Sequence, residues 1–180
     1  AEYSQYRKRP NRQTGHAQPA HLNKIVLRAL RESAYMFSRI LVAVDPSPSR
    51  LTSVRMAGEL ARLAGACVHV LHVVAAAVTL DTVVGLEDDA EARAILDEAV
   101  LALRDDGVKA DGTLANGLLN DVPALINETA GQFGADLIVL SPHHRGVVAA
   151  LFNPRVSDIV THASHTAVLL APDRPAATGA

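Results

Sequence analysis

The sequence contains few aromatic residues, one cysteine and no long apolar run. Aromatic residues occupy 3% of the 180 positions and none is Trp, so the core must consist of Ala, Val, Leu and Ile, and no base-stacking platform for nucleic acid is expected. The single Cys67 cannot form an internal disulfide, which predicts a reducing, cytoplasmic location. The apolar run Val70 to Leu80 is shorter than the roughly 20 residues of a membrane span, so no transmembrane segment is expected. No pattern of a secretory signal peptide is seen, and none is expected.

The net charge of −2 is distributed unevenly. Residues 1–35 carry seven Lys or Arg and two acids, whereas residues 36–180 carry ten and seventeen, so the two parts have net charges of +5 and −7. Within the basic part, apolar residues recur at helical spacing and predict one amphipathic helix, packed on its own domain or docked on an acidic partner or an anionic membrane: Leu22, Ile25, Val26, Ala29 and Leu30. We expect a basic N-terminal extension (1–35), a globular domain (36–175) and a short tail (176–180).

From residue 39 onward, strand-like apolar runs alternate with helical patterns. Strands are expected at 40–44, 67–74, 108–115, 136–140 and 166–171, the third being suited to a sheet edge. Helices are expected at 47–64, from about 87 to 106, from about 121 to 133 with Asn120 or Asp121 as its cap, and from about 154 to 163, with a loop at 75–86. This order predicts an open, doubly wound α/β fold with a five-stranded parallel sheet, whose ligand crevice lies beyond the carboxyl ends of the strands.

Three segments at this expected rim carry a family resemblance. They are Ile40-Leu-Val-Ala-Val-Asp-Pro-Ser47, Leu71-His-Val-Val74, and Asp136-Leu-Ile-Val-Leu140 followed by a loop that contains histidine. The chain resembles the universal stress protein family over residues 38–172. The resemblance implies a flavodoxin- or Rossmann-like domain, akin to the adenine nucleotide alpha hydrolases, and a homodimer joined through the last strand, Thr166 to Ala171.

The ATP-binding branch of that family has a glycine-rich loop, G-x2-G-x9-G-[ST], after the fourth strand. Aligned without a gap, the three glycine positions fall on Ser141, His144 and Pro154, and the Ser/Thr position falls on Arg155, so every glycine is missing. Glycine lets backbone N–H groups approach a phosphate closely, and Pro154 has no N–H at all. The pair His143-His144 resembles the universal stress protein A type, which implies a non-enzymatic, ATP-independent regulatory domain that acts through a protein partner not identified by the sequence.

The alternative is an ATP- or AMP-binding sensor of the same family. The resemblance places adenine and ribose contacts on Ala43, Val44, Asp45, Val73 and Leu140, and adds Ser141, His144, Arg145, Arg155, Val156 and Ser157 for the remainder of the nucleotide. Asp45 is the best single candidate, because a carboxylate at a strand end can accept hydrogen bonds from ribose hydroxyls. It can equally cap the turn before Pro46. A one-residue deletion that puts Asn153 on the third glycine loses the family match at Val156-Ser-Asp158.

Metal and catalytic sites are not predicted. The four C-terminal histidines His143, His144, His162 and His165 have no Cys or carboxylate at supporting spacing, and His72 is expected to be a hydrogen-bonded core or rim histidine. The sequence has no G-x-S-x-G, G-x-G-x-x-G or G-x4-G-K-[ST] motif. An adenylate-transferring enzyme would need a glycine-serine loop after the first strand, where the chain has Asp45-Pro46.

Overall fold

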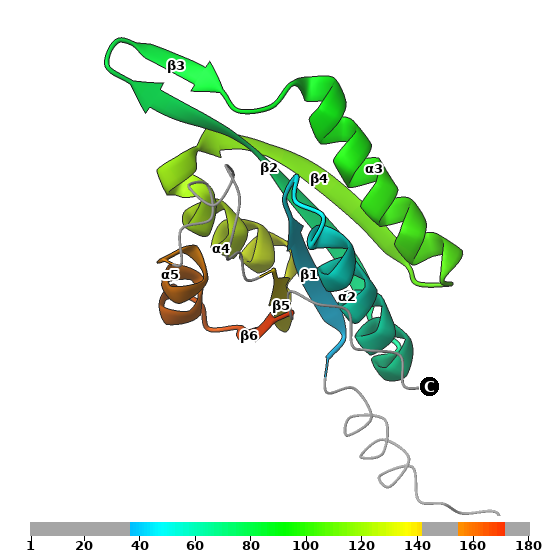
Figure 1. Ribbon diagram of the computed structural model, residues 1–180. Helices are drawn as coiled ribbons and strands as arrows, with labels where there is room; N and C mark the ends of the chain where they lie inside the picture. The colour runs from blue at the N-terminus through cyan, green and yellow to red at the C-terminus, as the bar shows by residue number, and fades with distance from the viewer. Residues whose placement is uncertain (1–36, 142–154, 172–180) are drawn as a thin grey trace, which may run out of the picture. The chain divides into compact units, whose positions relative to one another are not determined.

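The computed structural model describes residues 37–141 and 155–171, which form alternating strands and helices (Figure 1). The basic extension, the C-terminal tail, His144, Arg145 and the side chain of Arg155 lie outside this description. The elements are β1 (Arg39–Val44), α2 (Arg50–Ala64), β2 (Cys67–Thr79), β3 (Thr82–Gly85), α3 (Asp89–Asp105), β4 (Ala110–Leu118), the 3-10 helix η1 (Leu119–Asp121), α4 (Val122–Phe133), β5 (Leu137–Leu140), α5 (Arg155–Ala163) and β6 (Ala167–Leu170).

The sheet confirms the predicted doubly wound α/β fold. Five parallel strands follow one another across it in the order β4-β2-β1-β5-β6 in the part of the chain that is described. β2 and then β4 lie on one side of β1, and β5 and then β6 lie on the other. The strand order therefore reverses between β1 and β5. Helices α2 and α3 cover one face of the sheet, and α4 and α5 cover the other (Figure 1).

The central strands are apolar throughout because helices cover both of their faces. In β1, Ile40, Val42 and Val44 pack in the core cluster under α2 and α3, whereas Leu41 and Ala43 pack in the cluster under α4 and α5. Successive side chains of a strand point to opposite faces, so a strand that is covered on both sides needs an unbroken apolar run. The aliphatic bias of the composition therefore resides largely in these two clusters.

Helix ends follow the expected chemistry in most places. Gly65 and Gly134 end α2 and α4 in the left-handed conformation, with φ of 68° and 69°, and Asp88 caps α3 by accepting a hydrogen bond from the N–H of Glu91. The side-chain cap predicted for α4 is wrong. Asp121 precedes α4 but makes no capping bond, because it belongs to η1 and its φ and ψ of −90° and −10° are already helical.

The loop predicted at 75–86 is also wrong, because β2 continues to Thr79 and returns as the antiparallel strand β3. Ala76 pairs with Leu118 of β4 and with Gly85 of β3, and a strand residue has only two neighbouring sides. β3 therefore lies on the β1 side of β2, beyond the end of β1. The run of alanines in β2 has low β-propensity, which concealed the extension in the sequence.

Asp136 ties the start of β5 to the start of β1. Its carboxylate accepts hydrogen bonds from the N–H and hydroxyl of Ser38, both at 2.7 Å, and from the N–H of Arg39 at 3.0 Å. Burial acts to raise the pKa of Asp136, but these donors outweigh it and hold the pKa below its usual 3.8. A lowered pKa means that the carboxylate stabilises the fold above the unfolded-state pKa and loses this effect as pH falls through the folded-state pKa.

We therefore expect Asp136→Asn to lower the free energy of unfolding by about 1 kcal/mol near neutral pH, with the deficit disappearing in acid. Urea unfolding of both proteins across the acidic range measures this. Asp97→Asn, at an exposed position of α3, is the matched control and should change little. A deficit for Asp136→Asn that stays constant down to the acid limit would contradict the role given to the carboxylate.

Candidate functional site

The carboxyl ends of β1 and β5 meet at one edge of the sheet, beside residues 72–74 in the middle of β2. The pairing of β1 with β2 reaches Val44 and His72, and the pairing of β1 with β5 reaches Val42 and Val139. Continued by one or two residues, these registers bring Asp45 level with Val73 and bring Ala43 and Val44 level with Leu140 and Ser141. We call this edge the rim.

The structure brings the described sequence candidates together at the rim. Val156 of α5 is buried in the same core cluster as Ala43, Val73 and Leu140, and Ser157 follows it half-buried. Their role in binding a nucleotide remains a prediction.

Asp45 organises the turn that follows β1. It is buried, and its Oδ1 accepts hydrogen bonds from the N–H of Ser47 at 3.1 Å and from the Ser47 hydroxyl at 2.8 Å. The Ser47 hydroxyl also lies 2.7 Å from that of Ser49. The sequence left two roles open for Asp45, binding of ribose hydroxyls and stabilisation of the turn. These contacts are those of a turn-stabilising residue.

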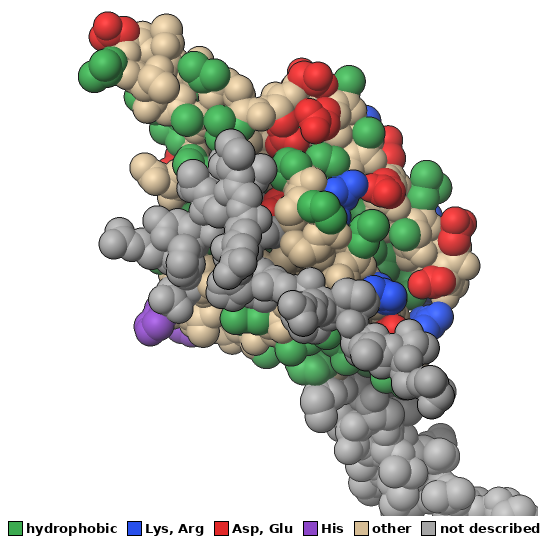
Figure 2. Space-filling view, in the orientation of Figure 1, with side chains coloured by type: hydrophobic (Ala, Val, Ile, Leu, Met, Phe, Trp, Pro, Cys, Tyr) green, Lys and Arg blue, Asp and Glu red, His purple; other side chains and the backbone are tan. Residues whose placement is uncertain are grey.

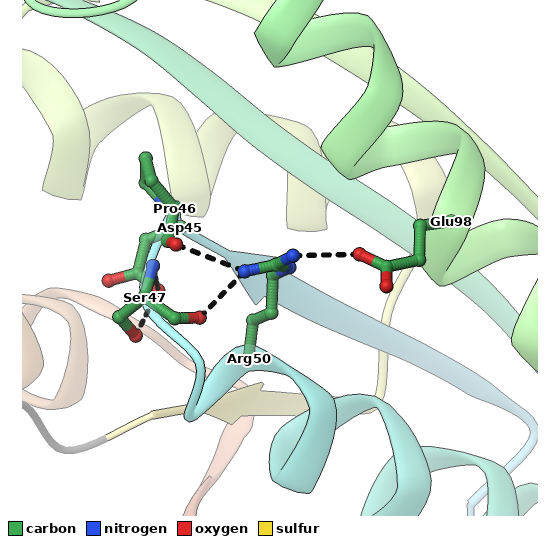
Figure 3. Close-up of polar contacts among 5 residues, drawn as sticks. All are labelled: Asp45, Pro46, Ser47, Arg50 and Glu98. Atoms are coloured by element: carbon green, nitrogen blue, oxygen red, sulfur yellow. Dashed lines mark hydrogen bonds and ion pairs between the residues drawn. The ribbon is translucent and has the colours of Figure 1, made fainter.

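Arg50, which is not among the residues predicted from the sequence, holds the same turn in place (Figure 3). Its Nη1 donates to the carbonyl oxygens of Pro46 and Ser47 at 3.0 and 3.1 Å, and its Nη2 lies 2.7 Å from Oε2 of Glu98 on α3. The guanidinium therefore joins the β1–α2 turn to a different helix. The helix dipole disfavours a cation at a helix N-terminus. A basic residue at the first position of α2 therefore indicated that its side chain binds another group.

Replacing Arg50 should loosen this turn. We expect Arg50→Met to lower the free energy of unfolding by about 1–3 kcal/mol, because two turn carbonyls and the Glu98 carboxylate lose their donor. Glu98 is half exposed, so the control Glu98→Gln should cost less than about 1 kcal/mol. Chemical denaturation checks both. Equal losses in the two variants would show that the ion pair, and not the bonds to the turn, carries the effect.

His72 confirms the prediction of a hydrogen-bonded rim histidine. Its Nδ1 lies 2.9 Å from the carbonyl oxygen of Val44, and its Nε2 lies 2.9 Å from the Glu87 carboxylate. The two side chains are 1% and 6% exposed. Because a carbonyl only accepts, Nδ1 must carry a proton, and the contact of Nε2 with the carboxylate requires one further proton that the pair shares. Glu87 thus joins the segment before α3 to His72 of β2, and His72 in turn contacts the end of β1.

A second buried polar contact lies at the point where strand order reverses. The hydroxyl of Ser53, fully buried in α2, is hydrogen-bonded to the hydroxyl of Ser141, the residue after β5. The family resemblance places Ser141 at the first glycine position of the ATP-binding loop, which is a prediction from the sequence. Its side chain is thus joined to α2, and this is a contact that glycine cannot make.

Among the residues that the structure describes, no three His, Cys, Asp or Glu side chains come together in a way that would hold a metal ion. None of the helices in this part of the chain is long and apolar enough to cross a membrane.

An open parallel sheet with its polar groups gathered at the switch point defines a Rossmann-like α/β domain. The model of the universal stress protein family matches residues 36–172, and the chain belongs to this family. A comparison with curated proteins found no match.

Solved structures agree with the family assignment. A universal stress protein from Archaeoglobus fulgidus in complex with dAMP is 26% identical, with a TM-score of 0.57, covering 76% of this chain and 99% of that one. A family protein from Burkholderia pseudomallei is 27% identical, with a TM-score of 0.57 and coverages of 78% and 98%. A universal stress protein in complex with cAMP, 23% identical with a TM-score of 0.57 and coverages of 77% and 98%, supports the fold alone.

Proposed function

We propose that this protein is a non-enzymatic stress-response domain that works without ATP and acts through protein partners. The main support for the proposal is that the polar groups at the rim are already bonded to one another. In the described part of the chain, the cation at the rim turn, Arg50, is bonded to two carbonyl groups and to Glu98, so its charge is already matched. The proposed place of action is the cytoplasm, where the thiol of Cys67 stays reduced.

The backbone of the turn supports the same proposal. A phosphate at a helix N-terminus needs free N–H groups. Here the N–H of Ser47 donates to Asp45, that of Arg50 donates to the carbonyl of Ser47, and those of Thr52 and Ser53 donate to the carbonyl of Ser49. A phosphate at the start of α2 would have to displace these bonds.

The sequence after β5 adds to this argument. Ser141, His144, Pro154 and Arg155 stand where the ATP-binding branch has three glycines and a Ser or Thr. Ser141 already bonds to Ser53, and Pro154 has no N–H to offer. The proposal is that this degenerate loop no longer holds a triphosphate, as in the universal stress protein A type.

Thermal unfolding in the presence of nucleotides tests the proposal. A ligand that binds only the folded state raises the midpoint, and at about 100 times its Kd it adds about 2.7 kcal/mol to the free energy of unfolding. We expect no rise in midpoint with ATP at millimolar concentration and no release of phosphate from ATP. A rise that saturates at micromolar ATP would overturn the ATP-independent function.

An adenine-nucleotide sensor is the second candidate. The relative from Archaeoglobus fulgidus in complex with dAMP favours it, together with the gathering of Ala43, Asp45, Val73 and Leu140 at the rim. This function requires AMP or ATP to raise the unfolding midpoint of the wild type and not that of Asp45→Ala. The comparison of the two proteins with and without nucleotide separates the candidates.

We further propose that the protein forms a homodimer through Thr166 to Ala171. In the described structure β6 pairs with β5 alone, at the edge of the sheet, and its Leu170 is 47% exposed. An apolar edge strand is a site for pairing with another chain. Light scattering of the full chain tests this proposal, and a mass of 19.0 kDa at all concentrations would contradict it.

A further inference from the structure

The hairpin that extends β2 is an arm with apolar side chains in solvent. We define the arm as residues 76–86. Val78 and Val83 are each 66% exposed, and Leu80 at the turn is fully exposed. Figure 1 shows the arm projecting beyond the rest of the sheet, and Figure 2 shows green apolar side chains along it.

The arm has no covering layer among the residues that the structure describes. Beyond Ala76, the end of β2 pairs only with β3, so the arm is a two-stranded ribbon. Such a ribbon is marginally stable in water by itself, and its open edges present unpaired N–H and C=O groups. Lys, Arg and Pro, which often protect exposed edges, do not occur in residues 76–86.

One face of the arm continues into a groove. Val74, Ala76 and Val78 alternate onto the same face of β2, and Val83 pairs with Val78 on that face. At the base of the arm, Val74 lines a groove of about 590 Å³ together with Leu114 and Asn116 of β4 and with Asp89 and Arg93 of α3. Groove and arm thus form one strip, which is concave and partly polar at its base and apolar along the arm.

The charges around this strip indicate the chemistry of its occupant. Residues 63–93 contain four exposed acids, Asp81, Asp88, Asp89 and Glu91, and one basic residue, Arg93, which gives these groups a net charge of −3; the fifth acid, Glu87, is paired with His72. Figure 2 shows acidic side chains at the tip of the arm and in a group beside it. An anionic membrane would be repelled, and a second arm would bring the same negative charges together.

We propose that the apolar face of the arm and the groove at its base form the docking surface for a partner protein segment that is both apolar and positively charged. The segment pairs with a free edge of the arm as an added strand, its apolar side chains cover Val78 and Val83, and its Lys or Arg side chains face the acids. This inference rests on the part of the proposed function in which the domain acts through partners. It does not depend on whether the rim binds a nucleotide.

Fluorescence anisotropy of the full chain with two labelled peptides tests the proposal. One peptide alternates Val and Lys, and the other alternates Val and Glu. We expect saturable binding of the first, weakened by salt, and none of the second. The double variant Val78→Thr/Val83→Thr keeps the shape and β-propensity of the arm and should weaken binding about tenfold through the loss of two buried methyl groups. Leu63→Gln, at an exposed position of α2, should leave binding unchanged.

Several results would overturn the docking surface. These are no binding of the Val–Lys peptide, equal binding of both peptides, or equal binding to the double threonine variant. A dimer that the double variant abolishes in sedimentation velocity would assign the arm to a second copy, and co-sedimentation with phosphatidylglycerol vesicles would assign it to a membrane. Nucleotide titrations are read separately, so failure of the docking surface and failure of ATP independence are distinguishable.

Discussion

His72→Leu is expected to lower the free energy of unfolding by about 3–5 kcal/mol, because it removes one partner from a buried, hydrogen-bonded His–Glu pair. The substitution leaves the carboxylate of Glu87, 6% exposed, without its imidazole partner, and it leaves the carbonyl of Val44 without the Nδ1 donor. The contacts that are lost lie at the end of β1 and in the segment that joins the arm to α3. Equilibrium unfolding in urea measures the loss.

Two control variants separate the pair from simple loss of packing. Glu87→Gln retains a polar group opposite Nε2 and should cost about 1 kcal/mol. The double variant His72→Leu/Glu87→Leu removes both polar partners and should be more stable than His72→Leu alone, since apolar replacement of an entire buried pair is often tolerated. If the double variant is the less stable of the two, the buried pair does not have the energetic role assigned to it.

Gly112→Ala is the second change with a large expected effect, a loss of about 1–3 kcal/mol from overpacking. Gly112 lies in β4 beneath α3, where an added Cβ would be 2.7 Å from Cδ1 of Leu96 and 2.9 Å from the carbonyl oxygen of Val70. The leucine can move its methyl group, but the carbonyl belongs to the backbone of the neighbouring strand. The close approach of α3 to the sheet therefore requires glycine here.

Gly131→Ala is the matched control for this change. Gly131 lies within α4, and an added Cβ would have no heavy atom within 4 Å, so the variant should gain about 0.5–1 kcal/mol from the higher helix propensity of alanine. Thermal or urea unfolding compares the two substitutions. A Gly112→Ala protein as stable as the wild type would mean that α3 can retreat from β4 without cost.

The parts of the fold that the sequence predicted are those set by local pattern. β1 and β5 are short apolar runs buried on both faces, and α2 ends at Ala64, before the left-handed Gly65, as its predicted range of 47–64 requires. Such features depend on the spacing of neighbours along the chain. The extension of β2 does not, because its alanines become a strand only through pairing with β4 and β3.

The candidate site was predictable to a similar extent. The sequence identified the rim strands and His72, but not the partners that fix them. Arg50 meets Glu98 across 48 positions, and Ser53 meets Ser141 across 88. Contacts of this kind arise from the packing of α2 against α3 and β5, which no local pattern encodes. The sequence could not decide whether Asp45 binds ribose or stabilises the turn, because its hydrogen bonds to Ser47 are seen only in the structure.

Isothermal titration calorimetry of the full chain with ATP tests the central claim most directly. If the rim turn is closed by its own hydrogen bonds and the degenerate loop holds no triphosphate, the wild type and Asp45→Ala will both give only heats of dilution up to millimolar ATP. Saturable binding with a micromolar Kd in the wild type, lost in Asp45→Ala, would contradict the account and establish a nucleotide sensor in its place.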